Sequence, residues 1–337
     1  MCFASPRHDR IVMRYQATTP GGIGNLGPGL DVLGCAIAGA RDEVMAEWCG
    51  TPGITIVDPG HPDLPRSPLK HTAAIAAAAV LHAALRAGVT LAGDGIALTV
   101  RKGLPLSGGQ GGSAASAVAG AAATNALLGS VLDLDTLLGC CLVAEAKVAG
   151  RHLDNIAPAL LGGIVLVRSI DPIDVVRLPV PAGLRLVLAH PAQRLSTAQS
   201  RRALPPMVPL STVTHQLAQV AAMVAACFSG DLALFGRAID DRIAEPARGA
   251  LIPGFVEAKR AAIDAGALGA SISGAGPTAF AIVGPEESAD RVASAMCEAY
   301  ARHGVACNTI VTTIDEQGTI VSALHERADE RLETTGS

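Results

Sequence analysis

The chain has 337 residues and a net charge of −4, and half of its residues are hydrophobic although only 2% are aromatic. This length suits two domains, and the composition is that of a folded globular protein and not of a disordered chain. Only four lysines are present and no basic stripe appears, so the sequence argues against a nucleic-acid-binding protein.

The eight cysteines are scattered, and only Cys140 and Cys141 are adjacent. Their spacing fits neither a zinc site nor a disulfide framework, so we expect buried free thiols in a reducing compartment. Residues 1–15 carry several charges without an apolar stretch, and the alanine-rich run 72–85 is too short to cross a bilayer. We therefore expect a cytoplasmic protein without a signal peptide or a membrane span.

The first half of the chain alternates between strand and helix patterns. Residues 95–101 alternate in hydrophobicity with period two, which predicts a strand, and Asp133 stands at the N-cap position of a helix. Residues 1–10 are expected to form a loose tail, and the glycine-rich stretch 20–31 a long loop. The predicted strands cover 11–15, 43–48, 53–57 and 95–101, and the predicted helices cover 68–87, 113–128 and 133–148.

A strand predicted over 163–168 ends the first half, after which the pattern of strands and helices restarts. We therefore place a domain boundary near residue 168, which divides the chain into domains 1–168 and 169–337. The polar last dozen residues are expected to fray. The second half is predicted to hold strands at 175–178, 184–189, 268–283 (interrupted by a turn) and 306–314, and helices at 211–228, 231–239, 254–265 and 285–303.

The segment 105–116, with the sequence PLSGGQGGSAAS, carries four glycines in five positions ahead of a predicted helix. Glycines let a backbone approach a phosphate closely, and the first turn of a helix offers unpaired N–H groups and a positive dipole end. Ser113 follows the glycines, where its hydroxyl can reach a phosphate oxygen or a magnesium ion. No Walker A lysine follows, and the dinucleotide spacing fails. The segment therefore indicates a nucleotide phosphate site, and the alternative is a flexible loop before an alanine-rich helix.

A second polar group surrounds the end of the helix predicted over 133–148. Glu145 lies late on that helix, and His152, Asp154 and Asn155 follow within ten residues, just before an apolar segment. Glu145 is a candidate magnesium ligand, because this ion prefers hard oxygen atoms. The alternative is an ordinary helix end at which a histidine interacts with the dipole.

Three further segments carry candidate contacts to a ligand. Asn25 and Asp31 flank a glycine-rich loop, and the alternative there is a capped turn. Thr197 and Arg201 lie four residues apart, so both face one way if the stretch is helical. Arg201 and Arg248 suit a carboxylate or a phosphate, although the usual fate of an arginine is a surface position. The turn 273–278, SGAGPT, has side chains small enough for a ligand or another backbone to approach closely. The alternative there is an ordinary hairpin turn.

Taken in chain order, these segments resemble the GHMP kinase superfamily and, within it, the homoserine kinase family. The phosphate loop of the superfamily, P-x-x-x-G-L-G-S-S-A-A, corresponds to 105–115. The homoserine kinase motifs correspond to NLGPGLDVLG at 25–34, HLDNIAPALLGG at 152–163, Thr197 with Arg201 and Leu204-Pro205, the segment 245–254, and 273–278. The phosphate loop differs from the superfamily pattern at two positions. Gln110 stands where the pattern has leucine, and Gly112 stands where it has the first of two serines.

The resemblance implies an α+β, two-domain GHMP kinase fold, with an N-terminal domain like ribosomal protein S5 domain 2 and a ferredoxin-like C-terminal domain. It implies ATP-dependent phosphorylation of the side-chain hydroxyl of L-homoserine in threonine biosynthesis, with Mg2+ and without nucleic acid or membrane partners. A homodimer follows by analogy with the family. Two alternatives stay open, namely a GHMP kinase for another small alcohol and a non-catalytic relative that binds a ligand.

The resemblance also assigns site residues by position, and no general base is assigned. The positions nearest the reaction are Asn155, Asp31, Ser113 and Glu145, of which Ser113 and Glu145 are the expected metal ligands. The expected nucleotide contacts are Pro105, Gly108, Gly109, Gln110, Gly111, Gly112, Ser113, Ala114 and Ser116. The expected substrate contacts are Asn25, Asp31, His152, Asp154, Asn155, Thr197, Arg201, Arg248 and Thr278.

Overall fold

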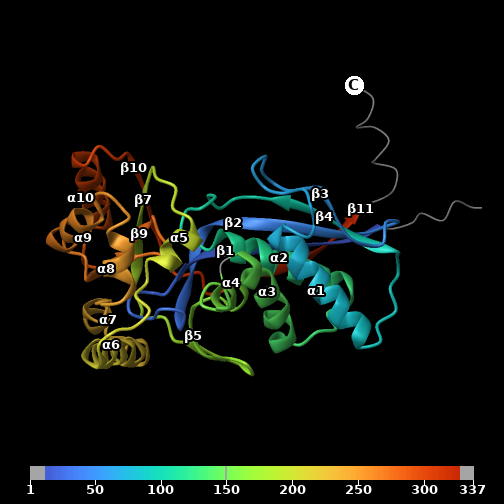
Figure 1. Cartoon of the computed structure of the whole chain (residues 1–337), viewed down its shortest axis with the longest axis horizontal. Helices are drawn as coiled ribbons and strands as arrows, with labels where there is room; N and C mark the ends of the chain where they lie inside the picture. The colour runs from blue at the N-terminus through green and yellow to red at the C-terminus, as the bar shows by residue number, and fades with distance from the viewer. Residues whose placement is uncertain (1–11, 149, 327–337) are drawn as a thin grey trace, which may run out of the picture.

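A computed structural model describes residues 12–148 and 150–326, and it contains two sheets, each covered by helices (Figure 1). The first sheet has the strand order β11-β1-β2-β4-β3, and β5 adds to β2 and pairs in turn with β6. Its strands are β1 (Val12–Gly24), β2 (Leu33–Cys49), β3 (Gly53–Asp58), β4 (Gly95–Arg101), β5 (Ile164–Ile170), β6 (Ile173–Leu178) and β11 (Ile320–Glu326).

Small side chains let the helices of the first domain pack closely against one another and against this sheet. Its helices are α1 (Thr72–Arg86), α2 (Gly112–Leu127), α3 (Leu134–Val148) and α4 (Ile156–Leu161). Helix α2 is buried from residue 114 to residue 127, which its alanine content permits. A Cβ atom at Gly120 would lie 2.5 Å from the carbonyl oxygen of Ala73, so only glycine lets α2 approach α1 this closely. The core of this domain therefore needs few aromatic residues.

The second sheet is fully antiparallel and has the order β10-β7-β9-β8. Its strands are β7 (Arg185–Pro191), β8 (Gly269–Ile272), β9 (Ala279–Val283) and β10 (Cys307–Thr312). In chain order this is 4-1-3-2, the arrangement of a ferredoxin-like fold, and the α+β fold class predicted from the sequence is confirmed. Its helices are α5 (Thr197–Arg202), α6 (Leu210–Ser229), α7 (Leu232–Arg237), α8 (Ala244–Gly249), α9 (Phe255–Asp264) and α10 (Ala289–Arg302).

The two domains share one apolar cluster, which fixes their relative position. Ile23 and Leu33 of the first sheet pack there with Leu188 of the second sheet and with Met223 of α6. Helices α9 and α10 cover the other face of the second sheet. Residue 168, the predicted domain boundary, lies within β5, and the division at that point stays a prediction. Within the described ranges, no helix is both long enough and apolar enough to cross a membrane.

Several elements differ from the sequence prediction. The stretch 20–31 was expected to be a loop, yet its first residues continue β1 as far as Gly24 and pair with β2. Strand β2 is longer than the predicted 43–48 because β1, β4 and β5 all pair along it. Helices α4, α5 and α8 and strand β11 were not predicted as elements. The tails predicted at 1–10 and in the last dozen residues lie outside the described residues, apart from the end of β11.

Candidate active site

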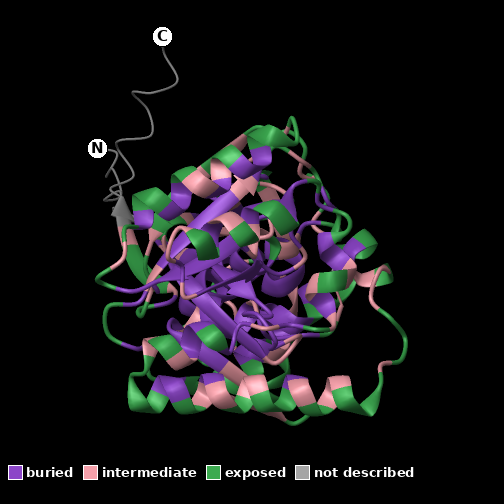
Figure 2. Cartoon of the chain, turned by 90° about the vertical axis from the view of Figure 1, so that its left-hand side faces the viewer, coloured by how far each residue is buried: buried purple, intermediate pink, exposed green. Residues whose placement is uncertain are grey.

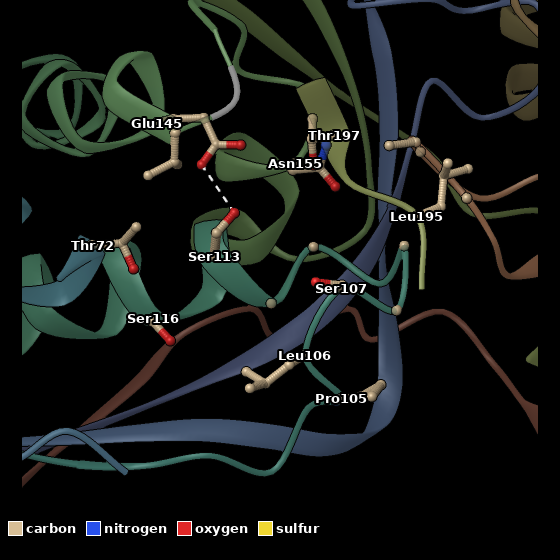
Figure 3. A pocket seen from close by; sticks show the side chains of 18 of the residues that line it. Thr72, Pro105, Leu106, Ser107, Ser113, Ser116, Glu145, Asn155, Leu195 and Thr197 are labelled. Carbon is tan, nitrogen blue, oxygen red and sulfur yellow. Dashed lines mark hydrogen bonds between the residues drawn. The ribbon is translucent and has the colours of Figure 1, made fainter. Parts of the chain in front are cut away.

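A pocket of about 460 Å³ opens between the two domains, where the predicted phosphate loop faces the turn 273–278 (Figure 3). Every segment singled out from the sequence contributes to its walls. Of the predicted site residues, the pocket is lined by Asn25, Asp31, Pro105, Gly108, Gly109, Gly111, Gly112, Ser113, Ser116, Glu145, His152, Asp154, Asn155, Thr197, Arg201 and Arg248. Gln110, Ala114 and Thr278 do not line it.

The phosphate loop ends where helix α2 begins. Gly111, with φ of +67°, is the N-cap of α2 and offers no side chain to cap it, so the N–H groups of the first turn are left for a ligand. Gly109 also has a positive φ, of +70°, and a Cβ atom there would lie 2.8 Å from two carbonyl oxygens of the opposite turn. The loop is therefore held closely against the second domain, and the amides of α2 point into the pocket.

A buried ion pair fixes the base of the phosphate loop. Asp42 on β2 has no exposed surface, and it pairs with Lys102, which also donates to the carbonyl oxygen of Gly112 at 3.0 Å. Asp42 also accepts the hydroxyl of Ser116 at 2.6 Å and the backbone N–H groups of Gly103 and Leu104. The hydroxyl of Ser116, a predicted nucleotide contact, is thus already engaged by this network.

Ser113 and Glu145 lie next to each other at the start of α2, as predicted for a pair of metal ligands (Figure 3). The Ser113 hydroxyl donates to Glu145 Oε2 at 3.3 Å, and Glu145 is 3% exposed. Burial raises the pKa of Glu145 to about 7, an effect that the positive charge of His152 and the Ser113 hydrogen bond only partly offset. A buried carboxylate whose pKa is raised in this way is stabilised by any cation that enters the pocket.

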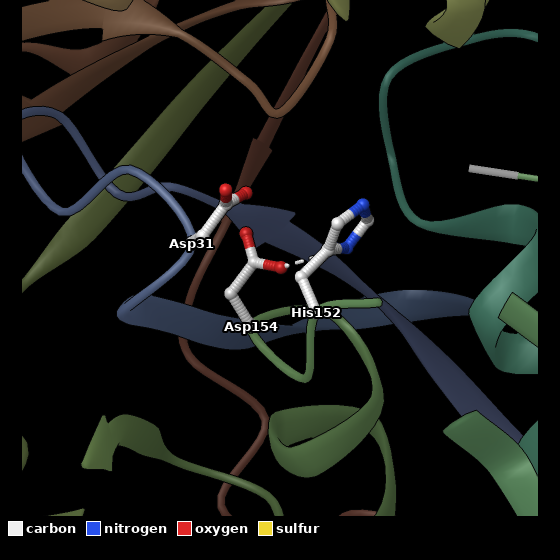
Figure 4. A group of neighbouring side chains, drawn as sticks. All are labelled: Asp31, His152 and Asp154. Atoms are coloured by element: carbon white, nitrogen blue, oxygen red, sulfur yellow. Dashed lines mark ion pairs between the residues drawn. The ribbon is translucent and has the colours of Figure 1, made fainter. Parts of the chain in front are cut away.

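Two carboxylates and an imidazole that line the pocket lie close together (Figure 4). Asp154 is buried, and its Oδ2 accepts the backbone N–H of Asn25 at 2.8 Å, while its Oδ1 lies 3.4 Å from Nδ1 of His152. Asp31 lies beside this pair, with one ligand atom of each of the three residues within 4.8 Å of the others. The Asn25 side chain donates to the carbonyl oxygen of Gly274 and accepts the N–H of Asp31, so it joins the two domains.

Two arginines of the second domain face these carboxylates. Arg201 on α5 donates to both oxygens of Asp31, at 2.7 and 2.8 Å. Burial alone would raise the pKa of Asp31, but the hydrogen bonds and charge of Arg201 outweigh that effect, and the pKa is lowered. Arg248 on α8 is 4% exposed and donates to the carbonyl oxygen of Gly274, while its Nε has no hydrogen-bond partner among the described residues. The pocket thus has carboxylates and guanidinium groups side by side.

The turn 273–278 grips the phosphate loop from the second domain. Ser273 donates its hydroxyl to the carbonyl oxygen of Gly109 at 2.5 Å, and Thr278 donates to that of Gly108 at 2.5 Å. The Thr278 hydroxyl is also 2.8 Å from Nδ1 of His190 on β7. Thr278 was predicted to contact substrate, yet it is fully buried behind the loop. We interpret it as a residue that positions the phosphate loop.

Replacing Thr278 by valine should raise the KM for ATP roughly five- to tenfold and leave the KM for the alcohol substrate nearly unchanged. The reason is that the Gly108 carbonyl loses its donor, so the loop becomes less ordered. Steady-state kinetics with each substrate varied in turn measures both constants. Thr124→Val is the matched control, because the buried Thr124 hydroxyl has no hydrogen-bond partner in the described part of the chain. A larger rise in the KM for the alcohol would support the substrate contact instead.

Sequence reasoning and structure differ at a few other positions. Gln110 is 5% exposed, and its backbone carbonyl oxygen accepts the N–H of Gly22. Ala114, on α2, is buried in the apolar core of the first domain. Asp42, Lys102, Ser273 and His190 were not predicted as site residues. Lys102 stands three residues before Pro105, the start of the loop, which was a usable signal, whereas Asp42 comes from a strand that is distant in the sequence.

Comparisons with known proteins agree with the family resemblance inferred from the sequence motifs. The family pattern described as the GHMP kinases N terminal domain matches residues 71–163, and that described as GHMP kinases C terminal matches 223–302. The chain is 42% identical over 287 residues to a homoserine kinase of Chlorobium phaeobacteroides (strain DSM 266), which covers 82% of this chain and 89% of the relative. A homoserine kinase of Arabidopsis thaliana is 41% identical over 302 residues, with 87% and 80% covered.

The chain belongs to the homoserine kinase family of the GHMP kinases. The crystal structure of a homoserine kinase from Cytophaga hutchinsonii superposes with a TM-score of 0.84 at 37% identity, covering 96% of this chain and all of that one. The resemblance inferred from the five motifs is therefore confirmed for the family and for the fold. The roles of individual site residues in this GHMP kinase stay predictions.

Proposed function

We propose that this protein transfers the γ-phosphoryl group of ATP to the side-chain hydroxyl of L-homoserine, a step of threonine biosynthesis. The observation that carries the proposal is the charge arrangement of the pocket. The open amides of α2 and the charged side chains of Asp31, Asp154, Arg201 and Arg248 line the same pocket. This charged group suits a zwitterion, because carboxylates bind an ammonium group and guanidinium groups bind a carboxylate.

The reaction needs positioning and charge stabilisation more than covalent help. The homoserine oxygen forms a bond to the γ-phosphorus, the bond from that phosphorus to the bridging oxygen breaks, and ADP leaves with the electron pair. The hydroxyl proton is released to solvent or to a phosphate oxygen. Asn155 lines the pocket beside Gly111 at the start of α2 and is the residue we propose to orient the hydroxyl. Asp31 is a poor base, because Arg201 lowers its pKa.

Ser113 and Glu145 fit a magnesium ion, because both offer hard oxygen atoms, they lie within 3.3 Å of each other, and the Glu145 carboxylate is buried. When bound, the ion neutralises charge on the phosphate oxygens. The uncapped amides of α2 hold the phosphates of ATP, and the residues that line the pocket keep water away from the reacting oxygen. Lys102 holds the carbonyl oxygen of Gly112 and so supports the loop from below.

The assay that tests this proposal couples ADP release to a spectroscopic readout with homoserine, serine or mevalonate as acceptor. We expect homoserine to give the highest kcat/KM, since the pocket offers partners for both of its charged groups. Mevalonate lacks the ammonium group that Asp31 and Asp154 would bind. Turnover with mevalonate or a sugar alone would favour another GHMP kinase, and no turnover with any acceptor would favour a non-catalytic relative.

Replacing Ser113 by alanine should raise the concentration of magnesium needed for half-maximal activity about tenfold and leave homoserine binding largely intact. The change removes one of the two proposed oxygen ligands but no group near Arg201. Magnesium titrations of the initial rate measure the effect, and calorimetry reports homoserine binding. Ser294→Ala, at an exposed position on α10, is the control. An unchanged magnesium requirement would remove Ser113 from the metal site.

The proposal extends to the setting of the enzyme. The acceptor is a small molecule, and we infer a cytoplasmic enzyme without nucleic acid or membrane partners, in keeping with the net charge of −4 and the scattered free thiols. We also infer, by analogy with the family, that it acts as a homodimer.

A further inference from the structure

The loop between β1 and β2, residues 25–32, is held in a conformation that its residues do not prefer. Asn25, Leu26 and Asp31 all have a positive φ, between +30° and +66°, in the left-handed region that side chains other than glycine rarely adopt. Such a backbone persists only where surrounding contacts hold it. Because this loop carries Asn25 and Asp31 into the pocket, those contacts decide where the two side chains lie.

One of these contacts comes from Gln216 on α6, a helix of the second domain. Helix α6 runs along the lower edge of that domain in Figure 1, and Figure 2 shows it lengthwise, with buried and exposed residues interspersed. Gln216 is buried, and its Nε2 donates to the backbone carbonyl oxygen of Pro28 at 3.0 Å. No other donor to this oxygen lies in the part of the chain that the structure describes. The loop is therefore anchored to α6 at Pro28.

The same amide group also reaches the start of α8. Nε2 of Gln216 donates its second proton to Oδ1 of Asp241 at 2.7 Å, and Oε1 accepts the backbone N–H of Arg242 at 3.2 Å. The carbonyl of Pro28 and the carboxylate of Asp241 only accept, so the orientation of the amide is fixed. Asp241 is buried and also accepts the backbone N–H groups of residues 243–245, where α8 begins. Gln216 therefore binds the loop and the start of α8 at once.

Helix α8 carries Arg248, the buried arginine of the pocket. Its Nη1 donates to the carbonyl oxygen of Gly274 at 2.7 Å, and the Asn25 side chain donates to the same oxygen at 3.1 Å. The loop and α8 are thus connected twice, once at Gly274 and once through Gln216 and Asp241. A single connection would leave the loop free to rotate relative to α8, whereas two connections fix its position.

We propose that Gln216 is a positioning residue that sets the distance between the carboxylate of Asp31 and the guanidinium group of Arg248. This inference rests on the proposed function, in which acidic groups of the pocket hold the ammonium group of homoserine and arginines hold its carboxylate. Gln216 itself is not among the residues that line the pocket, so it acts only through these groups. The phosphate loop is held by a separate set of hydrogen bonds, so we expect ATP binding to be independent of Gln216.

Replacing Gln216 by methionine keeps the length of the side chain and removes its amide. We expect Q216M to raise the KM for homoserine about five- to tenfold and the KM for ATP less than about twofold, because the side chains that it displaces, Asp31 and Arg248, bind homoserine in our proposal. Initial rates with each substrate varied in turn measure both constants, and calorimetry measures homoserine binding directly. Q216N is a second variant, because its shorter side chain keeps an amide but cannot reach both Pro28 and Asp241.

Asn125→Leu is the matched control for the loss of a buried amide. Asn125 is also buried, and its side chain binds both backbone groups of Leu132, but it does not line the pocket. N125L should lower the melting temperature and leave both KM values unchanged. A second comparison uses an R248K background, in which the effect of Q216M on the KM for homoserine should fall below about threefold. The reason is that one of the two groups that Gln216 positions is then absent, whereas a general loss of stability would act equally in both backgrounds.

Three results would overturn the proposal. The first is that folded Q216M and Q216N keep the wild-type KM for homoserine, the second is an equal rise in both KM values, and the third is a Q216M effect of full size in the R248K background. Circular dichroism and the melting temperature verify that each variant folds. A wild-type protein that neither binds nor phosphorylates homoserine would refute the proposed function and this inference together. An active wild-type enzyme whose KM for homoserine is unaltered by Q216M would refute this inference alone.

Discussion

Replacing Arg201 by alanine should raise the KM for homoserine roughly 30- to 300-fold and change the KM for ATP by less than about threefold. Arg201 lines the pocket, and Asp31, which also lines it, accepts hydrogen bonds from both terminal nitrogens of its guanidinium group. The loss corresponds to a bidentate, charge-assisted contact to the amino acid carboxylate. Initial rates with each substrate varied in turn measure both constants.

The neighbouring residue supplies the control for this experiment. Arg202 lies on the same helix, is exposed and does not line the pocket, so R202A should leave both constants unchanged. Arg201→Lys keeps the charge but loses the fork, and we expect an intermediate KM. Equal increases in the KM values for homoserine and ATP would contradict the placement of Arg201 at the substrate.

Replacing Glu145 by glutamine should lower kcat at least about 100-fold in the presence of magnesium and, without magnesium, stabilise the protein at pH 8. The folded-state pKa of Glu145 is about 7, above the ordinary value of 4.5 that we take for the unfolded chain. At pH values between 4.5 and 7, Glu145 binds more protons in the folded state than in the unfolded state. Its ionisation therefore makes the folded state less stable as the pH rises. Glutamine never ionises, and the gain in the free energy of unfolding at pH 8 should be about 3 kcal/mol.

Urea unfolding at pH 5 and pH 8 without divalent cations measures this linkage. The advantage of E145Q should be near its full value at pH 8 and should shrink to about a quarter of it at pH 5, where Glu145 of the folded form is neutral and the unfolded form is close to its own pKa. For the wild-type enzyme, magnesium affinity should fall as the pH drops below about 7, because the metal requires the ionised carboxylate. The control is Glu298→Gln, at an exposed position on α10. An E145Q protein that is less stable at pH 8 would show that burial is not the dominant effect.

Local patterns predicted the elements nearest the site well. The strand predicted at 95–101 matches β4, and the helix predicted at 113–128 matches α2 within one residue. The alternating apolar positions of the strand and the glycines before the helix are strong local signals. Sequence motifs also placed Glu145 and Arg201 in one pocket, although nothing in their spacing fixed how far apart they would lie.

The missed features depend on contacts between distant segments. Strand β1 continues through Pro20 to Gly24 because β2 pairs with it there, which outweighs the weak strand preference of these residues. Helix α4 contains Pro158, which reads as a helix breaker, yet it lies in the first turn where no N–H partner is lost. Asp42 gives no local sign that Lys102 and Ser116 will bind it. Such contacts exist only once the sheet has formed.

The last strand lies beside the first, with Thr18 paired to Ile320. During synthesis on the ribosome, β1 therefore leaves the exit tunnel long before its neighbour exists. Its hydrogen-bonding edge stays open until β11 has been translated, and the hydrogen bonds from Ser273 and Thr278 to the phosphate loop also form late. A nascent chain that lacks β11 is thus prone to aggregation through the open edge of β1, which makes chaperone protection most valuable in that interval.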